Sequence, residues 1–281
     1  MRFGIVTPVL NGRDYIRACC ASVAAQVEGG CPHPPDVTHY IRESSRSTET
    51  VEDIAAEYGC EYKREEDTGL YDAIARGLDA AAADGCDILA WLNADEQYLP
   101  GAFNSQFTIY NSQFVFGDYL IADPDVPSVL AARREIPARE FYLRHGVNYI
   151  MSCATFFTRE AWLKYGPFDL SYKYAADKKF YFKALASGAK FRHISAWQGA
   201  YGATGRNKSL DEKVHAERAR LRGEIGAFKS PAVRKTIRAM RIVEKVLRGC
   251  HRREHIVTTL YDRDGKPCEV SGVYTGKWVD K

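Results

Sequence analysis

Residues 87–101, DILAWLNADEQYLPG, place two acidic side chains directly after a short apolar run. The apolar run has the length and composition of a buried strand, and it ends abruptly at Asn93. Asp95 and Glu96 then stand side by side, where their carboxylates repel each other and lose hydration. A divalent cation, which takes oxygen ligands, would offset that cost. The residues leave one alternative open, a helix that starts here with Asp95 as its N-cap.

Strand and helix patterns alternate through the first hundred residues. Strand patterns are each followed by a helical pattern, the strands at 2–8, 36–43 and 60–65 and the helices at 12–26, 47–59 and 69–85. We expect Thr48 or Thr50 to cap the second helix and Gly59 to end it. The alternation predicts an α/β fold with a mixed, mostly parallel sheet that is flanked by helices.

Ligands of such sheets bind beyond the carboxyl ends of the strands. The two carboxylates that follow the fourth strand lie at such an end. Other strands end in Thr7-Pro8, in Glu43-Ser44 and in the EEDTG segment at 65–69. We expect all these tips to meet at one rim, which is therefore the candidate site.

The pattern changes after residue 105, where antiparallel strands mix with helices. Residues 113–125 read as an antiparallel ribbon, 175–188 as a helix that Gly188 ends, and 189–202 as a further strand. We therefore predict a main domain at 1–210.

The remaining residues, 211–281, form a predicted appendage of helices and a hairpin around Asp264-Gly265. Its basic helix, expected from Pro231 to Glu254, carries Ile237, Met240, Val243 and Leu247 at mixed spacings of three and four. Such an amphipathic helix docks on its own domain, on a second protomer in a homo-oligomer, or on an anionic membrane surface. The sequence leaves these three open.

Composition excludes several classes of protein. The net charge of the 281 residues is only +3, so no nucleic-acid partner is indicated. We see no basic leader ahead of a long apolar stretch, and no run approaches the ~18 apolar residues of a spanning helix. The eight cysteines form no CxxC pair, which favours buried, reduced thiols and a cytoplasmic protein.

Five segments occur in the order seen in the family 2 glycosyltransferases: GIVTPVLNGRDYIRACCASV, EDTGLYDAIARGLDAA, DILAWLNADEQYLPGA, TFFTREAWLKYGPFD and YAADKKFYFKALASG. The resemblance covers roughly residues 3 to 200. It implies the GT-A (Rossmann-like) fold, with a nucleotide-binding half at 1–104 and an acceptor-side half at 105–210. It also implies an inverting hexosyltransferase that uses a nucleotide-diphospho-sugar, usually with Mn²⁺ or Mg²⁺.

The resemblance assigns roles residue by residue. Asp177 matches the catalytic base, and Asp95 with Glu96 matches the metal position in a motif usually written with two final aspartates. The expected nucleotide-sugar-binding residues are Thr7, Pro8, Glu43, Arg46, Asp67, Gly69, Asp72, Arg76, Asn93 and Asp95. Three simpler roles stay open: a helix cap for Asp67, an i, i+4 pair for Asp72 with Arg76, and an exposed charged helix face for Asp177.

Residues 43–50, ESSRSTET, depart from the family pattern, which commonly reads Asp-Gly-Gly-Ser-Thr-Asp-Gly-Thr. Glu43 stands where an aspartate usually contacts the base and ribose, and Arg46 is placed to reach a phosphate. A UDP-linked donor is the expected choice. The implied acceptor is a saccharide or lipid-linked saccharide in surface polysaccharide or glycolipid assembly, at the inner face of the membrane. A non-catalytic nucleotide-sugar-binding relative and a nucleotidyltransferase remain the alternatives.

Overall fold

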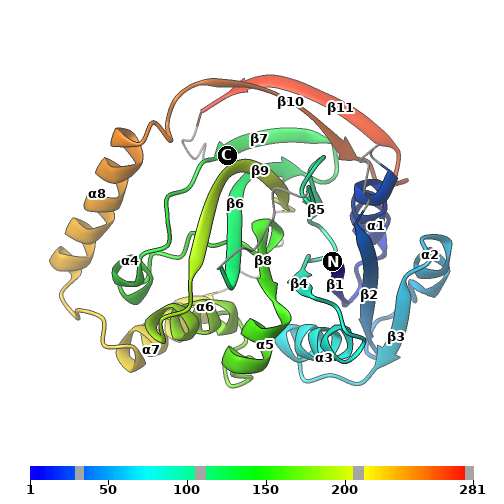
Figure 1. The fold of residues 1–281 in the computed structure, drawn as a ribbon, viewed down its shortest axis with the longest axis horizontal. Helices are drawn as coiled ribbons and strands as arrows, with labels where there is room; N and C mark the ends of the chain where they lie inside the picture. The colour runs from blue at the N-terminus through cyan, green and yellow to red at the C-terminus, as the bar shows by residue number, and fades with distance from the viewer. Residues whose placement is uncertain (29–34, 105–111, 205–211, 276–281) are drawn as a thin grey trace.

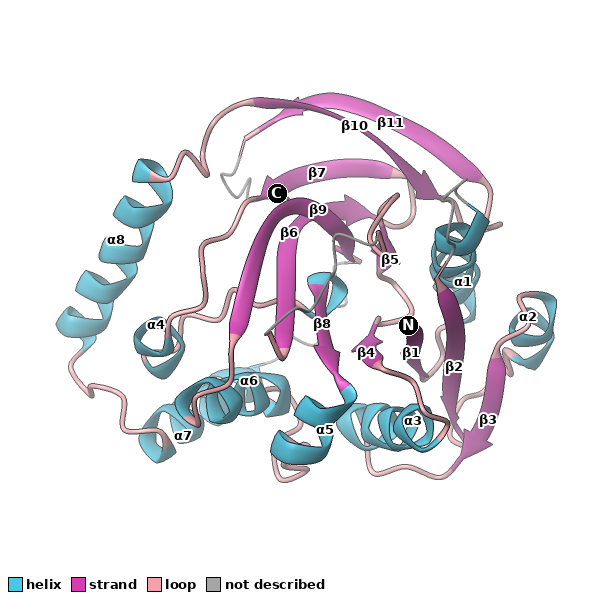
Figure 2. Ribbon diagram, viewed as in Figure 1, coloured by secondary structure: helices cyan, strands magenta, loops and turns pink. Residues whose placement is uncertain are grey.

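The computed structural model describes residues 1–28, 35–104, 112–204 and 212–275. These residues form a nine-stranded mixed sheet with helices on both faces, and a two-stranded hairpin lies beyond one end of it (Figures 1 and 2). The strand order is β3-β2-β1-β4-β8-β6-β9-β5, and β7 pairs with β6.

The first half of the sheet is parallel, as its apolar strand runs predict. β1 (Arg2–Val9) pairs with β2 (Asp36–Ser44) and β4 (Ile88–Trp91), and β2 pairs with β3 (Glu61–Glu65). Parallel neighbours need long crossovers, and these are helical. The crossover helices are α1 (Arg13–Glu28), α2 (Glu52–Glu57) and α3 (Leu70–Ala83).

The second half of the sheet is mainly antiparallel. Its strands are β5 (Gln97–Tyr98), β6 (Phe114–Asp123), β7 (Ser128–Arg133), β8 (Thr155–Thr158) and β9 (Phe191–Gly202). β8 runs antiparallel to both β4 and β6 and so joins the two halves. Residues 113–125, predicted as an antiparallel ribbon, supply only one of its strands, β6, and its antiparallel partner β7 follows outside that range.

Apolar layers cover both faces of the sheet. On one face an aromatic cluster lies under α3, α5 (Arg159–Tyr165) and α6 (Ala176–Ala186), and in it Trp91 stacks on Tyr181 with ring centroids 5.9 Å apart. On the other face, under α1, Phe3 stacks on Phe103 at 4.9 Å. Because both faces are filled, ligands are left with the sheet's edges and strand ends.

Helix ends show where local signals were overruled. Neither threonine is the N-cap of α2: Val51 occupies that position, and its N–H donates to the Glu43 carboxylate at 3.3 Å. Thr50 still accepts the Glu52 N–H at 3.2 Å. Asp95 starts no helix, since the chain turns there and enters β5.

The basic C-terminal helix is shorter than predicted. α8 (Pro231–Leu247) ends before the expected Glu254, because the chain turns at Gly249, whose φ is +73°, and then begins a strand. That strand, β10 (Glu254–Tyr261), pairs antiparallel with β11 (Pro267–Tyr274). The predicted hairpin around Asp264-Gly265 is thereby confirmed.

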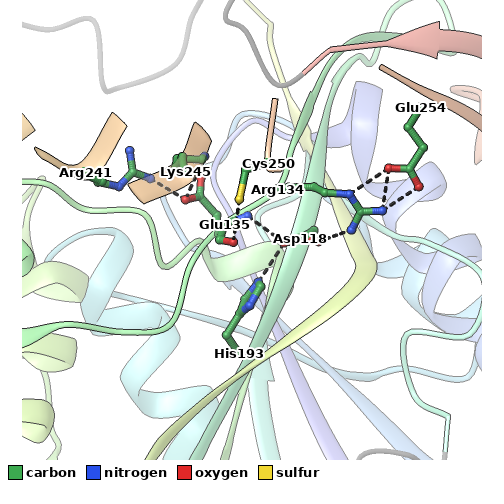
Figure 3. A network of polar contacts seen from close by, with 8 residues as sticks. All are labelled: Asp118, Arg134, Glu135, His193, Arg241, Lys245, Cys250 and Glu254. Atoms are coloured by element: carbon green, nitrogen blue, oxygen red, sulfur yellow. Dashed lines mark hydrogen bonds and ion pairs between the residues drawn. The ribbon is translucent and has the colours of Figure 1, made fainter. Parts of the chain in front are cut away.

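The residues after 211 cover parts of the main sheet and its helices. α7 (Glu212–Glu224) buries Val214 and Leu221, α8 buries Ile237, and Figure 1 shows the hairpin arching over β7. A buried polar network ties α8 and β10 to β6 (Figure 3). In it Arg134 bridges Asp118 and Glu254, both at 2.6 Å, while Glu135 meets Lys245 at 3.2 Å. The division into 1–210 and 211–281 stays a prediction.

Candidate functional site

The ends of β1 and β2 are held together by a turn that the sequence analysis passed over. Asn11 follows β1 with a φ of +53°, and its side-chain oxygen accepts the N–H and the hydroxyl of Thr48 at 2.9 and 3.1 Å. Its own N–H donates to Ser47 at 3.3 Å. The Asn-Gly dipeptide after the first strand was the signal for this turn. These bonds therefore hold the segments that follow β1 and β2 in place relative to each other.

Thr7 and Pro8 lie inside the molecule rather than on the rim surface. Thr7 is fully buried, and its hydroxyl is 2.8 Å from Nε2 of His39 and 3.5 Å from Sγ of Cys19. Pro8 is buried within β1. These two residues shape the wall behind the strand ends.

The carboxylate of Glu43 is already hydrogen-bonded to neighbouring residues of the protein. Its Oε2 accepts from Tyr62 at 2.5 Å, from Thr50 at 3.2 Å and from the Val51 N–H at 3.3 Å. The side chain is almost fully buried, and Oε1 has no hydrogen-bond partner among the described residues. The carboxylate thus fixes the start of α2 and leaves one acceptor oxygen unused.

Arg46 and Asp67 form an ion pair at 2.6 Å that joins the loops after β2 and β3. The carboxylate of Asp67 is buried and also accepts the Gly69 N–H at 2.8 Å, so it holds the turn that leads into α3. Gly69 has a φ of +139°, which residues with a side chain rarely adopt. The guanidinium of Arg46 remains half-exposed at the rim.

Asp72 and Arg76 pair with each other at 3.0 Å, as their i, i+4 spacing allowed. The Arg76 guanidinium lowers the pKa of Asp72, although burial opposes the shift. Asp72 also accepts the N–H of Thr68 at 2.8 Å. Both residues therefore stabilise the first turns of α3.

Asp95 and Glu96 carry the largest electrostatic strain at the strand ends. Burial raises the pKa of Asp95 to about 6, and burial together with the Asp95 charge raises the pKa of Glu96 to about 8. Glu96 accepts the Asn93 N–H at 2.9 Å and the Ser152 hydroxyl at 3.3 Å, both from neutral donors. Both carboxylates of the acidic pair are thus desolvated at the strand end.

The donor set at this tip fits a hard divalent cation. Mg²⁺ and Mn²⁺ are held by one or two carboxylates and complete their shell with phosphate oxygens and water. Asp95 and Glu96 supply those carboxylates, and a cation would reverse the rise in both pKa values. Asp95 also lines a small pocket with Tyr15 and with Arg263 of the hairpin.

Asp177 lies in the first turn of α6 and is not an exposed surface charge. It is half-buried, and its Oδ1 accepts the hydroxyl of Tyr71 at 2.8 Å. Tyr71 belongs to α3, directly after the Asp67–Gly69 turn. Its bond therefore brings the predicted Asp67–Gly69 motif next to Asp177, the predicted base. Lys173 reinforces the contact by donating to the Thr68 carbonyl at 2.9 Å.

The buried side chain of Tyr181 is affected by the charges of both Asp177 and the acidic strand end. Desolvation raises the pKa of Tyr181 well above its usual value, and the charges of Asp177 and Glu96 add to that rise. Both carboxylates are therefore within electrostatic range of one phenol. His193 bonds to Asp118 at 2.9 Å and His145 to the Phe141 carbonyl at 2.8 Å, so both histidines have structural partners.

The chain matches Glycosyl transferase family 2 over residues 4–163. That match covers more than half of the sequence, and the protein belongs to this family. Comparison with curated proteins gives no match.

Solved structures of glycosyltransferases share the fold. Residues 1–349 of S. aureus TarS in complex with UDP-GlcNAc superpose with a TM-score of 0.59 at 14% identity, over 88% of this chain and 73% of that chain. The mannosyltransferase PcManGT from Pyrobaculum calidifontis, in complex with GDP-Man and Mn²⁺, gives 0.56 at 14% identity, over 86% and 69%. This chain spans only 43% of a longer TarS chain. At such identities the similarity shows the GT-A fold alone.

Proposed function

We propose that the protein is an inverting glycosyltransferase that moves a sugar from a nucleotide-diphospho-sugar to an acceptor hydroxyl. The observation that carries this proposal is the position of Asp177. Its carboxylate is fixed by Tyr71 at 2.8 Å and shares the surroundings of Tyr181 with Glu96. A base and an acidic cation site close together are what a single displacement at an anomeric carbon requires.

The chain's own residues would divide the work as follows. Asp177 takes the proton from the acceptor hydroxyl, whose oxygen then attacks the anomeric carbon from the face opposite the diphosphate, so the configuration inverts. Tyr71 keeps the carboxylate oriented. Asp95 and Glu96 would hold Mn²⁺ or Mg²⁺, which supplies charge neutralisation for the leaving diphosphate.

The donor pocket would be built from the rim between β1, β2 and β4. A UDP-sugar is our first choice, and the complexes of TarS with UDP and UDP-GlcNAc support it. The GDP-Man complex of PcManGT supports a guanine nucleotide instead. Because Glu43 already serves Tyr62 and Thr50, base recognition would fall to its unused Oε1 and to backbone groups.

A melting-temperature screen against UDP-, GDP-, TDP- and CMP-sugars, with and without Mn²⁺, tests the proposal, since a ligand stabilises the folded protein by mass action. One donor should stabilise the protein only with the metal and should be turned over. Stabilisation without hydrolysis or transfer would favour the non-catalytic relative. Release of pyrophosphate from a nucleoside triphosphate would favour a nucleotidyltransferase.

A lipid-linked acceptor at the inner face of a membrane suits the surface of α8. Met240, Val243 and Leu247 lie exposed on this basic helix, beside a groove of about 700 Å³. None of the described helices is long and apolar enough to span a bilayer. We propose that α8 makes a peripheral membrane contact, with a second protomer as the competing occupant.

A further inference from the structure

A small pocket lies between α4 (Glu140–Arg144), α6 and α7, three helices that Figure 1 shows gathered at one corner of the molecule. It encloses about 30 Å³, above the roughly 10–15 Å³ that one water molecule needs. Its lining includes three basic side chains, Lys178, Arg218 and Arg222, together with the apolar side chains of Leu143 and Leu221. We call it the basic pocket.

The three cations of the basic pocket have no ion-pair partner among the described residues. The Nε of Arg218 is buried without a hydrogen bond, and burial with the nearby arginines lowers the pKa of Arg222. Burial also lowers the pKa of Lys178, against the opposing effect of Asp177. Three partly buried cations that line one pocket repel one another, and an anion between them would offset that repulsion.

The neighbouring cations on the same helices are treated differently. Lys179 binds both Asp169 and Glu224 at 2.7 Å, and Arg220 donates to Ser171 at 2.8 Å. The acidic groups of this corner are therefore engaged by the cations that face outward. Among the described residues, these acidic groups therefore form no ion pair with the three pocket cations.

The basic pocket is positioned next to the proposed base. Lys178 is the residue after Asp177 on α6. Glu217, the residue before Arg218, accepts the backbone N–H groups of Lys173 and Tyr174 at 2.5 and 2.8 Å. The loop that leads into α6 is thus bonded to α7 one residue before Arg218.

We infer that the basic pocket binds a phosphate or diphosphate group of the acceptor. Arginine pairs bind phosphate oxygens in a fork geometry, and a dianion would satisfy the buried Nε of Arg218. The anion would not be the donor's diphosphate, because the pocket walls are α4, α6 and α7, whereas the donor is expected at the ends of β1, β2 and β4. The inference rests on the proposed function in assigning the anion to an acceptor.

Calorimetry with inorganic pyrophosphate in the absence of divalent metal tests the pocket itself. Arg218→Gln should weaken this binding about tenfold or more, because it removes a charge-assisted contact. Arg220→Gln, on the same helix but facing outward, is the matched control and should bind as the wild type does. Equal pyrophosphate affinities of the two variants would rule out anion binding in the basic pocket. So would binding that needs Mn²⁺ and is lost in Asp95→Ala, because it would place pyrophosphate at the donor site.

Transfer assays test the assignment to the acceptor. With a sugar acceptor that carries a phosphate, Arg218→Gln should raise the acceptor KM about tenfold and change kcat little, whereas a phosphate-free acceptor should be used equally by both proteins. Equal use of both acceptors by the variant would refute the assignment. Arg218-dependent pyrophosphate binding without any donor binding would instead refute the proposed glycosyl transfer and leave the anion pocket standing.

Discussion

The hydroxyl of Tyr71 donates a 2.8 Å hydrogen bond to Oδ1 of Asp177, although 106 residues separate the two in the chain. The bond joins the first turn of α3 to the first turn of α6. It links the loop that Arg46 and Asp67 hold with the carboxylate that we propose as the general base. A change on one side of this bond should therefore be felt on the other.

Replacing Asp177 by Asn should lower kcat by ~10²-fold or more, in the range typical of general-base loss. The amide keeps the size of the side chain and can still accept from Tyr71, so the fold and the donor affinity should change little. Steady-state kinetics with calorimetric donor binding checks both expectations. Near-full turnover by the variant would reduce Asp177 to a positioning charge.

Removing only the hydroxyl, in Tyr71→Phe, should have a smaller effect of the same kind. The carboxylate loses the bond that orients it, and we expect kcat to fall up to about tenfold while the donor KM stays within about twofold. Tyr165→Phe is a suitable control, because it removes a buried hydroxyl that has no hydrogen-bond partner among the described residues. If both variants slow transfer equally, the Tyr71 bond has no special role.

Asp95→Ala should abolish the metal-dependent binding of a nucleoside diphosphate, since the remaining Glu96 cannot hold the cation alone. The test is calorimetry with UDP in the presence and absence of Mn²⁺. The variant should also fold well, because it removes a carboxylate whose burial is costly. An unchanged affinity with Mn²⁺ would remove Asp95 from the site.

The acidic pair should make stability depend on pH in the metal-free protein. The pKa values of Asp95 and Glu96 are raised to about 6 and about 8, from 3.8 and 4.5. The folded state therefore binds more protons than the unfolded state in this range, and the stabilisation present at low pH is lost as pH rises through 6 and then 8.

Mn²⁺ should accordingly raise the melting temperature more at pH 8 than at pH 5, where it must displace protons. Melting curves at both values, with Glu96→Gln as the comparison, measure this. The variant should lose most of the pH dependence between 6 and 8. A metal effect that is the same at both values would contradict the assignment of the pair.

The parallel half of the fold was predictable because its signals are local. Apolar runs such as Ile88–Trp91 end at turn or charged residues, and helices between them carry their own periodicity. Charge partners were not predictable in the same way. The expected contact of Glu43 with the base and ribose stays a prediction, but its bonds to Tyr62 and Thr50 carried no local signal. Tyr62 comes beside it through the pairing of β2 with β3, and Thr50 lies in the connection between those strands.

Distance along the chain explains why other contacts were not predicted. No local pattern indicated that Tyr71 would contact Asp177 or that Arg218 and Lys178 would line one pocket, since these arrangements depend on how α3 and α7 pack against α6. The spacing predicted an amphipathic helix at α8, but only Ile237 of its four apolar positions is deeply buried. Periodicity shows which residues share a face, and it does not show what covers that face.

The exposed face of α8 should bind anionic lipid. Met240 is 50% exposed and Leu247 is 82% exposed, and basic residues on the same helix would meet the headgroups, each contributing about 1 kcal/mol near such a surface. We expect the protein to float with anionic vesicles and not with neutral ones, and Leu247→Glu to reduce that flotation severalfold. Val257→Glu, at a 57% exposed position of the hairpin, is the control and should float as the wild type does. If Leu247→Glu leaves flotation unchanged but converts a dimer into a monomer in sedimentation, the face belongs to a second protomer and the membrane role is excluded.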